Sequence, residues 1–242
     1  MTANLADALI TKVTVSNALD TLDIQAVQQL PIRERQLPAQ TVIVADGSRT
    51  KESCLLVEGF AFRAKVTTDG KRQVLSLHVP GEIPDLQSLH LGIMDHDFST
   101  LTPCTLGFIS HEALKSLNRE RPNVAAALWR ETLIDASIFR EWIVNVGRRS
   151  AAQRMAHLFA EMHRRLQAIG RTSGGEFAFP ITQSDLADCL GLSNVHINRV
   201  LQELRESGLM QVDRSQYRIL DHAKLEELAG FDPAYLHLQP NG

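Results

Sequence analysis

The chain of 242 residues has only three cysteines, Cys54, Cys104 and Cys189, which stand far apart in the sequence. An odd and scattered set argues against a disulfide framework, and the spacing matches no zinc or iron–sulfur motif. Each is expected to be a small buried residue in a reducing cytoplasm. No apolar run approaches the roughly 20 residues of a membrane-spanning helix, and no basic leader followed by an apolar core marks export. The sequence therefore predicts a cytoplasmic protein that is not inserted in a membrane.

Side-chain patterns typical of enzymes are also missing. We find no nucleophile elbow and no P-loop, and the glycine-bearing turns are too short and scattered to cradle a phosphate. We therefore expect no enzyme and no catalytic residues. An excess of positive charge is absent as well: the formal net charge is −3, and residues 147–242 hold eleven Lys/Arg and eleven Asp/Glu. DNA-binding domains commonly present a basic face, so this balance neither supports nor excludes DNA as a partner.

The chain is long enough for two domains, and its composition, 44% hydrophobic and 22% charged, is that of a globular protein. Residues 4–30 show helical spacing. From about Ile32 to Ser110 the pattern becomes short period-two runs separated by turns with glycine or proline, which predicts an antiparallel sandwich or barrel. Examples of the expected strands are 41–44, 54–57, 60–66, 73–78 and 104–109.

A long helix is predicted from Pro122 to about Val146, between a short helix over 111–118 and another over 151–169. It has two apolar stripes, and a helix that is apolar on two sides must bury both. We expect a second copy of the chain to cover one of them in a dimer; the alternative is a core helix of the monomer. The predicted dimer interface is Ala127, Ile134, Ile138 and Trp142, and the second stripe is Leu128, Leu133, Phe139 and Ile143.

Residues 181–210 are typical of a helix-turn-helix. Thr182 is placed to cap the first helix with Asp185 three residues later, Gly191 ends that helix, and Ser193 caps the second. The second helix has an apolar stripe and polar side chains elsewhere, which suits a DNA major groove. An ordinary helical hairpin with a solvated face is the alternative at this point.

A hairpin follows the two helices and favours the DNA-binding interpretation. Residues 207–212 leave the second helix at a glycine and enter a strand, 213–216 form a turn, and 217–220 return as a second strand. Two helices followed by such a hairpin make a winged helix, in which Arg214 at the tip would contact phosphate.

The order of a β-roll, a long helix and a winged helix resembles the CRP/FNR superfamily of bacterial transcription regulators. Segments 79–86, 104–110, 181–187, 191–193 and 198–205 carry the resemblance. It implies an α+β fold with an antiparallel, jelly-roll-like β-roll sensor domain over 1–120, a dimerisation helix and hinge over 121–148, and a winged helix-turn-helix over 149–242. It also implies a homodimer that binds a two-fold symmetric DNA operator and acts on RNA polymerase.

The resemblance places the family's DNA-binding residues on particular positions of this chain. Its guanine-reading arginine falls on Arg199, whereas the glutamate that accepts from cytosine is replaced by Val195, which could contact a thymine methyl instead. Ser193, Thr182 and Gln183 match phosphate-contacting positions. The further candidates for base or backbone contact are Asn194, His196 and Asn198.

The cyclic-nucleotide signature of the family is only half present. Gly81, Glu82 and Ile83 resemble its opening, but Pro84 replaces a small residue and no arginine occurs between Arg72 and Arg119. A buried phosphate would then lack a cation, so we expect no response to cyclic AMP. The iron–sulfur mechanism of the family needs cysteines near the N-terminus, and none precedes Cys54.

A cluster of histidine and aspartate over residues 90–97, which includes Asp95 and His96, lies where the effector would bind. Such side chains hold metal ions or haem in some proteins, but a capped turn in which they bond to nearby backbone is the favoured explanation, and we assign no metal and no cofactor. The sequence therefore predicts a homodimeric DNA-binding regulator with an unidentified small-molecule effector pocket that involves residues 81–83, 95 and 96. The alternative is a ligand-binding or protein-interaction module whose winged helix does not bind DNA.

Overall fold

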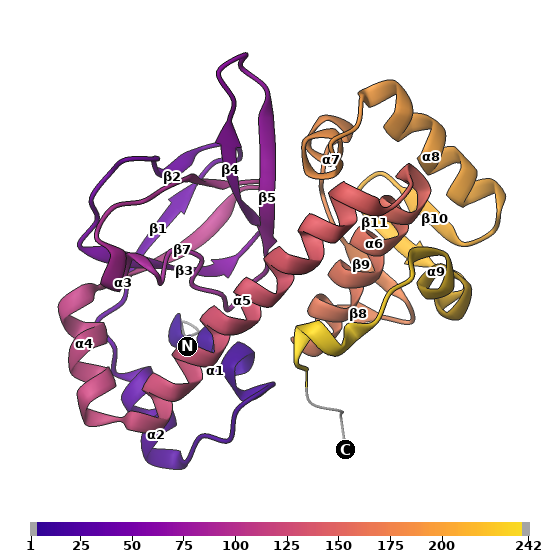
Figure 1. The fold of residues 1–242 in the computed structure, drawn as a ribbon. Coiled ribbons are helices and arrows are strands. Elements are labelled where there is room, and N and C mark those ends of the chain that lie inside the picture. The colour runs from indigo at the N-terminus through magenta and orange to yellow at the C-terminus, as the bar shows by residue number, and fades with distance from the viewer. Residues whose placement is uncertain (1–3, 239–242) are drawn as a thin grey trace. The chain divides into compact units, whose positions relative to one another are not determined.

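The structure is a computed structural model that describes residues 4–238, and the fold it shows is divided into two compact units (Figure 1). The first unit consists of residues up to 65 and 77–136, and the second of residues 66–76 and 137–238. The 27-residue helix α5 (Pro122–Arg148) therefore contributes to both units. The domain boundaries predicted from the sequence, at residues 120 and 148, lie at the two ends of α5. The contacts of the folded chain instead place the boundary between the two units inside α5, between residues 136 and 137.

The first unit contains the predicted β-roll, built from two antiparallel sheets with the strand orders β1-β7-β3 and β2-β6-β4-β5. Helices stand at its ends, and Figure 1 shows α1, α2 and α4 around the N-terminal half of α5. The strands are β1 (Arg33–Leu37), β2 (Val42–Val44), β3 (Glu52–Glu58), β4 (Ala61–Val66), β5 (Arg72–His78), β6 (Asp97–Thr100) and β7 (Cys104–Ser110). The helices are α1 (Ala6–Thr14), α2 (Thr21–Gln28), α3 (Ser88–Leu91) and α4 (His111–Glu120).

Two apolar clusters hold this unit together. One joins Leu55 of β3 and Ile109 of β7 to α1, α2, α4 and the start of α5, and the other lies between the sheets around Phe98 and Leu106. Cys54 and Cys104 are buried in the second cluster, and Cys189 is buried in the other unit, as the sequence predicted. Gly59 has φ +90° and leaves no space for a side chain, because a Cβ there would lie 2.5 Å from the carbonyl oxygen of Pro103.

The second unit contains the predicted winged helix. Its sheet has the strand order β10-β11-β9-β8, and ring contacts among Phe159, Phe177, Phe179 and Tyr217 form part of its core. The helices are α6 (Ala151–Ala168), α7 (Gln183–Leu190), α8 (Asn194–Glu206), α9 (His222–Ala229) and the short 3-10 helix η1 (Pro233–Leu236). The strands are β8 (Thr172–Ser173), β9 (Glu176–Ala178), β10 (Met210–Asp213) and β11 (Gln216–Ile219).

Strands β1, β6 and β8 were absent from the sequence prediction. Strand β1 has the sequence Arg-Glu-Arg-Gln-Leu, is largely exposed and pairs only with β7, so it carries no period-two apolar signal. Strand β8 has only two residues and lies in a segment predicted to be a loop. None of the helices in residues 4–238 is both long and apolar enough to cross a lipid bilayer.

Candidate nucleic-acid interface

The two helices of the helix-turn-helix are set by local hydrogen bonds at their ends. Thr182 and Asp185 form a reciprocal capping box at the start of α7: the Thr182 hydroxyl accepts from the Asp185 amide at 3.1 Å, and the Asp185 carboxylate accepts from the Thr182 amide at 3.4 Å. The Thr182 hydroxyl also donates to that carboxylate at 2.6 Å. Gly191 ends α7 in the left-handed conformation, with φ +63°. Ser193 caps α8 by accepting from the His196 amide at 3.3 Å. All three local predictions are confirmed.

Helix α8 separates a buried stripe from an exposed polar face. Its apolar residues Ile197, Val200, Leu201 and Leu204 are at most 5% exposed. On the other faces Val195 is 81% exposed, and Asn194, Asn198 and Arg199 are exposed as well. A single-stripe helix of 13 residues with free polar side chains has the size and chemistry for a major groove.

The Arg199 guanidinium is held by two neighbours on its own helix. Its Nη2 donates to His196 Nε2 at 2.8 Å, and its Nε lies 3.6 Å from Glu203 Oε1. The side chain remains 67% exposed, so it is available to an incoming base edge. Asn198, one position earlier, donates from Nδ2 to the carbonyl of Asn194 at 3.2 Å.

The remaining predicted DNA contacts also lie at the surface. Thr182, Gln183 and Ser193 are exposed around the N-terminal ends of α7 and α8, where backbone amides favour phosphate. Arg214 sits at the turn between β10 and β11 with φ +54° and is exposed. Arg218 of β11, in contrast, faces Glu176 of β9 at 3.1 Å, which partly neutralises its charge. Among the nine residues predicted to contact DNA, His196 is half-buried and the other eight are exposed.

The effector region predicted in the β-roll is occupied by a buried polar cluster, which we define as Arg63, His78, Glu82, Asp85, His96 and Asp135. Arg63, from β4, donates from Nη1 to Asp135 on α5 at 2.6 Å and from Nη2 to the carbonyl of Pro84. The Arg63 side chain is 4% exposed and that of Asp135 is 27% exposed. A cation is therefore present, although the sequence argument found none. The sequence feature that could have indicated this buried cation is an arginine inside the apolar run Phe60–Ala64, in a strand that precedes the cyclic-nucleotide signature.

Three members of the buried polar cluster, His78, His96 and Asp85, have shifted pKa values. Burial, followed by the nearby charge of Arg63, lowers the pKa of both His78 and His96. Burial raises the pKa of the Asp85 carboxyl to about 7, even though that carboxylate accepts a hydrogen bond from the Cys54 amide at 2.7 Å. Glu82 pairs with His78 at 2.9 Å. The cluster thus has one permanent cation and two or three acids, which leaves no positive charge for a phosphate.

The five residues predicted to line the effector pocket are not all brought together. The Gly81 amide donates to the carbonyl of Leu56 at 2.7 Å, and a Cβ at Gly81 would lie 2.5 Å from the carbonyl oxygen of Ala8. Ile83 packs against the apolar cluster that contains α1. Of the five, Glu82 and His96 belong to the buried polar cluster, whereas Gly81 and Ile83 face α1. Asp95 is exposed and bonds only the neighbouring His96, at 2.6 Å.

The histidine and aspartate cluster of residues 90–97 forms hydrogen bonds within the protein. The local bond within this cluster is the one between His96 and Asp95 at 2.6 Å, whereas Asp97 accepts from the amide of Asp46, on a different segment, at 2.8 Å. Across residues 4–238, no three His, Cys, Asp or Glu side chains converge in the way that a metal ion requires.

The stripe of α5 predicted to form the dimer interface lies inside its own chain. Ala127, Ile134, Ile138 and Trp142 are 1%, 5%, 6% and 5% exposed, so they have almost no area to offer a second subunit. That assignment is wrong, and the alternative of a core position holds for these four residues. The exposed apolar residues of α5 are instead Trp129, Leu133, Ile143 and Val144.

Trp142 is fixed by a buried hydrogen-bond network that the sequence did not reveal. Its indole Nε1 donates to both oxygens of Glu161 on α6, at 3.2 and 3.1 Å, and Tyr235 of η1 donates to Glu161 Oε2 at 2.8 Å. Arg165 lies 3.1 Å from the same carboxylate. Glu161 is fully buried, which raises its pKa. A glutamate within the apolar run 155–162 was the signal for this network, which joins the end of α5 to α6 and η1.

Two families of known proteins match the two parts of the chain. A cyclic nucleotide-binding domain matches residues 34–121, and a Crp-like helix-turn-helix domain matches residues 153–228. Similar proteins include the transcriptional activator protein FnrL of Cereibacter sphaeroides, 27% identical over 88% of this chain and 86% of that one. The nitrogen fixation regulation protein FixK of Bradyrhizobium diazoefficiens is 25% identical over 93% of each chain.

Solved structures show the same fold. FixK2 from Bradyrhizobium japonicum superposes with a TM-score of 0.75 at 22% identity, covering 82% of this chain and 98% of that one. The c-di-GMP-responsive regulator CLP of Xanthomonas campestris gives a TM-score of 0.65 at 17% identity, covering 84% and 100%. The match to the Crp-like helix-turn-helix domain and the regulator relatives, together with this fold, show a transcription regulator with a DNA-binding helix-turn-helix. The chain belongs to the CRP/FNR superfamily.

Proposed function

We propose that the protein is a cytoplasmic, homodimeric regulator that binds a two-fold symmetric DNA operator sequence-specifically and acts on RNA polymerase. The observation that carries this proposal is the exposed face of α8, on which the Arg199 guanidinium is held by His196 and Glu203 while the apolar residues face inward. Because each subunit presents one such helix, a dimer would read two half-sites related by its own symmetry.

The residues predicted to contact DNA each have a role in this proposal. Arg199 donates two hydrogen bonds to O6 and N7 of a guanine, and Val195, which has no acceptor, contacts a thymine methyl. The amide of Asn198 suits an adenine, whereas Asn194 and His196 contact neighbouring bases or the backbone. The residues that position the protein on phosphates are Thr182, Gln183, Ser193 and Arg214.

The exposed apolar face of α5 is the proposed dimer interface. Trp129, Leu133 and Ile143 are 64%, 51% and 69% exposed, which is unusual for large apolar side chains on one helix. In the four-and-three spacing of a two-stranded coiled coil, Arg140 and Gly147 occupy two of the positions, and the apolar positions are Trp129, Leu133, Ala136 and Ile143. A second copy of α5 would bury these side chains.

The β-roll of this protein would not bind cyclic AMP in the way the family signature implies. The amides of Gly81 and Glu82 already donate to the carbonyls of Leu56 and Val79, and Arg63 is held by Asp135 and Pro84. An iron–sulfur cluster is equally unsupported, because it needs several cysteines at one place, whereas Cys54 and Cys104 lie in the β-roll and Cys189 lies in the other unit. Any small-molecule effector would therefore be of a different chemical kind.

Replacing Arg199 with alanine tests the proposal. An operator is first selected from random duplexes with the native protein, and its affinity is then measured by fluorescence anisotropy. Loss of the bidentate guanine contact should weaken binding by about 1–3 kcal/mol per half-site and remove the preference for guanine there. Arg171→Ala, which removes an exposed arginine of the loop after α6, is the matched control and should bind normally.

Two results would contradict the proposal. The first is an unchanged base preference of Arg199→Ala in a footprint, which would remove Arg199 from base recognition. The second is a native protein with no measurable, salt-dependent affinity for duplex DNA, which would favour a module whose winged helix has another role.

A further inference from the structure

Strands β4 and β5 are neighbours in a sheet of the β-roll, but the hairpin that they form also packs within the second unit. Residues 66–76 belong to that unit together with the helix-turn-helix, although the strands on either side of the hairpin begin and end in the β-roll. Two consecutive side chains of β5, Arg72 and Gln73, contact α7, the first helix of the helix-turn-helix.

Arg72 binds two carboxylates of α7 at once. Its Nε lies 2.7 Å from Asp188 Oδ2 and its Nη2 lies 2.7 Å from Asp185 Oδ1, so one guanidinium spans one turn of the helix. The Asp185 side chain is 5% exposed and therefore needs a partner for its charge. Burial alone would lower the pKa of Arg72, but Asp188 and Asp185 raise it above its ordinary value.

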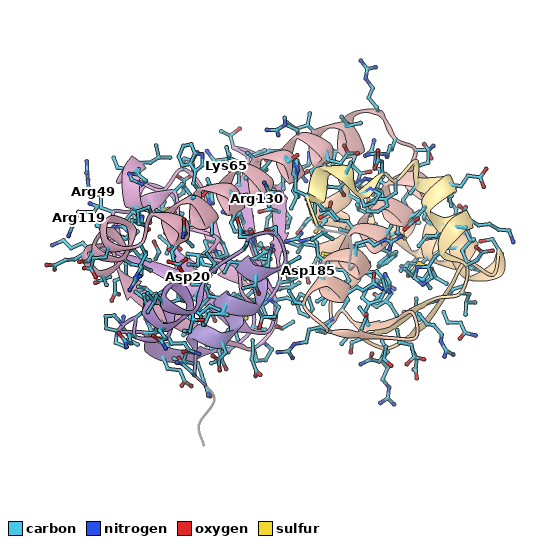
Figure 2. The ribbon with its side chains drawn as sticks, turned by 90° about the horizontal axis from the view of Figure 1, so that it is seen from below. Asp20, Arg49, Lys65, Arg119, Arg130 and Asp185 are labelled. Atoms are coloured by element: carbon cyan, nitrogen blue, oxygen red, sulfur yellow. The ribbon has the colours of Figure 1, made fainter. Side chains whose placement is uncertain are left out.

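Asp185 connects Arg72 to the start of α7. While Oδ1 accepts from Arg72, Oδ2 accepts from the hydroxyl of Thr182 at 2.6 Å and from its amide at 3.4 Å, the second of which completes the capping box. Thr182 is one of the residues proposed to contact phosphate. At the other end of α7, Gln73 Nε2 donates to the carbonyl of Cys189 at 3.3 Å. The hairpin thus holds both ends of this helix. Figure 2 labels Asp185 on α7.

We infer that Arg72 is a positioning residue for DNA binding, which acts through Asp185 to hold Thr182 and the N-terminal end of α7 against the operator backbone. The part of this inference that concerns DNA affinity rests on the proposed function. The part that concerns the stability of α7 does not, and the two parts are tested by separate experiments.

The first experiment measures hydrogen exchange of the full-length protein without DNA. In Arg72→Gln the amides of α7 should exchange about fivefold faster, the effect of weakening a helix cap, while the amides of α8 keep their protection. Lys71→Gln is the matched control: it removes one positive charge from the same hairpin, but Lys71 is 83% exposed and bonds Asp69 rather than α7.

The second experiment measures affinity for the selected operator. Arg72→Gln should bind about fivefold to tenfold more weakly, Lys71→Gln should bind normally, and Arg72→Lys should recover only part of the loss, because an ammonium cannot span two carboxylates as a guanidinium does. In Asp188→Asn the further effect of Arg72→Gln should shrink, which identifies the pair as coupled.

Three outcomes would overturn the inference. Unchanged exchange of α7 in Arg72→Gln would show that the hairpin does not hold this helix. If Arg72→Gln and Lys71→Gln weakened DNA binding equally, the effect would come from the loss of one positive charge and not from the contact with α7. If Arg72→Gln bound DNA more tightly, the contact between Arg72 and α7 would inhibit DNA binding. If the native protein binds no DNA, the proposed function and the positioning role both fail, and the exchange data show separately whether Arg72 holds α7.

Discussion

The buried Asp85 gives a sharp test of the polar cluster in the β-roll. Its carboxyl is 1% exposed, accepts from the Cys54 amide through Oδ1 and, within residues 4–238, has no hydrogen-bond partner for Oδ2. Burial raises its pKa from 3.8 to about 7. Asparagine has the same shape as the protonated acid and keeps an acceptor for Cys54, so Asp85→Asn mimics the neutral form at every pH.

The sign of the effect follows from proton binding in the two states. Between about pH 4 and 7 the folded protein holds the Asp85 proton, whereas the unfolded chain has lost it. The native protein therefore loses stability as the pH rises through this window, while Asp85→Asn does not. A shift of about three pKa units corresponds to at most about 4 kcal/mol in favour of the variant above pH 7, and to almost no difference below pH 4.

Urea unfolding followed by far-ultraviolet circular dichroism, at intervals from about pH 4 to 8, measures this difference. Asp95→Asn is the control. Its side chain is 79% exposed; partial burial acts to raise its pKa, but the hydrogen bond from His96 lowers it overall, so this group titrates below the window. Parallel stability curves for the native protein and Asp85→Asn would refute the reasoning, and so would an advantage of the variant that shrinks with rising pH.

Two further predictions concern the dimer and the half-site. Ile143→Glu places a charge on the exposed face of α5 and should yield a folded monomer in sedimentation, whereas Leu22→Glu, at an equally exposed position of α2, should remain dimeric; a dimer of Ile143→Glu would exclude this face. Val195→Glu supplies an acceptor for cytosine and should shift the selected half-site by about 1–3 kcal/mol toward a cytosine at that position. A half-site unchanged by Val195→Glu would place residue 195 away from the base edges.

The buried polar cluster also bears on how this β-roll is regulated. Arg63 bonds Asp135 on α5, so the interior of the β-roll is tied directly to the long helix by the protein's own side chains. A ligand that competed for Arg63 or Glu82 would have to break a bond of 2.6 or 2.9 Å inside the protein. That cost separates this β-roll from one whose cationic group is open to an anionic effector.

Much of the winged helix could be predicted from the sequence. Thr182, Asp185, Gly191 and Ser193 act within one turn of their own helix ends, so their hydrogen bonds depend only on neighbouring residues. The buried stripe of α8 follows from its three- and four-residue spacing. The sequence predicts strands of the β-roll where apolar and polar residues alternate. Strand β1 shows no such alternation, because it is an exposed edge strand of mostly charged residues, and it was therefore not predicted.

The same reasoning could not say which face of α5 is buried. Both of its stripes are apolar, and periodicity alone assigns neither to the interior, so the stripe chosen for the dimer was the wrong one. Nor could it find Arg63 or Glu161 as members of polar networks, because a charged residue inside an apolar run is explained only by the partner that neutralises it.

The amino-acid sequence by itself determined the helix ends, the winged helix and the family, because each depends on residues a few positions apart. Tertiary structure alone decided how the charges are used. Arg63 meets Asp135 across 72 positions, Arg72 meets Asp185 across 113, and Tyr235 meets Glu161 across 74. The physical reason is that a buried charge is stable only beside a partner, and the folded backbone, not the order of residues, brings that partner within reach.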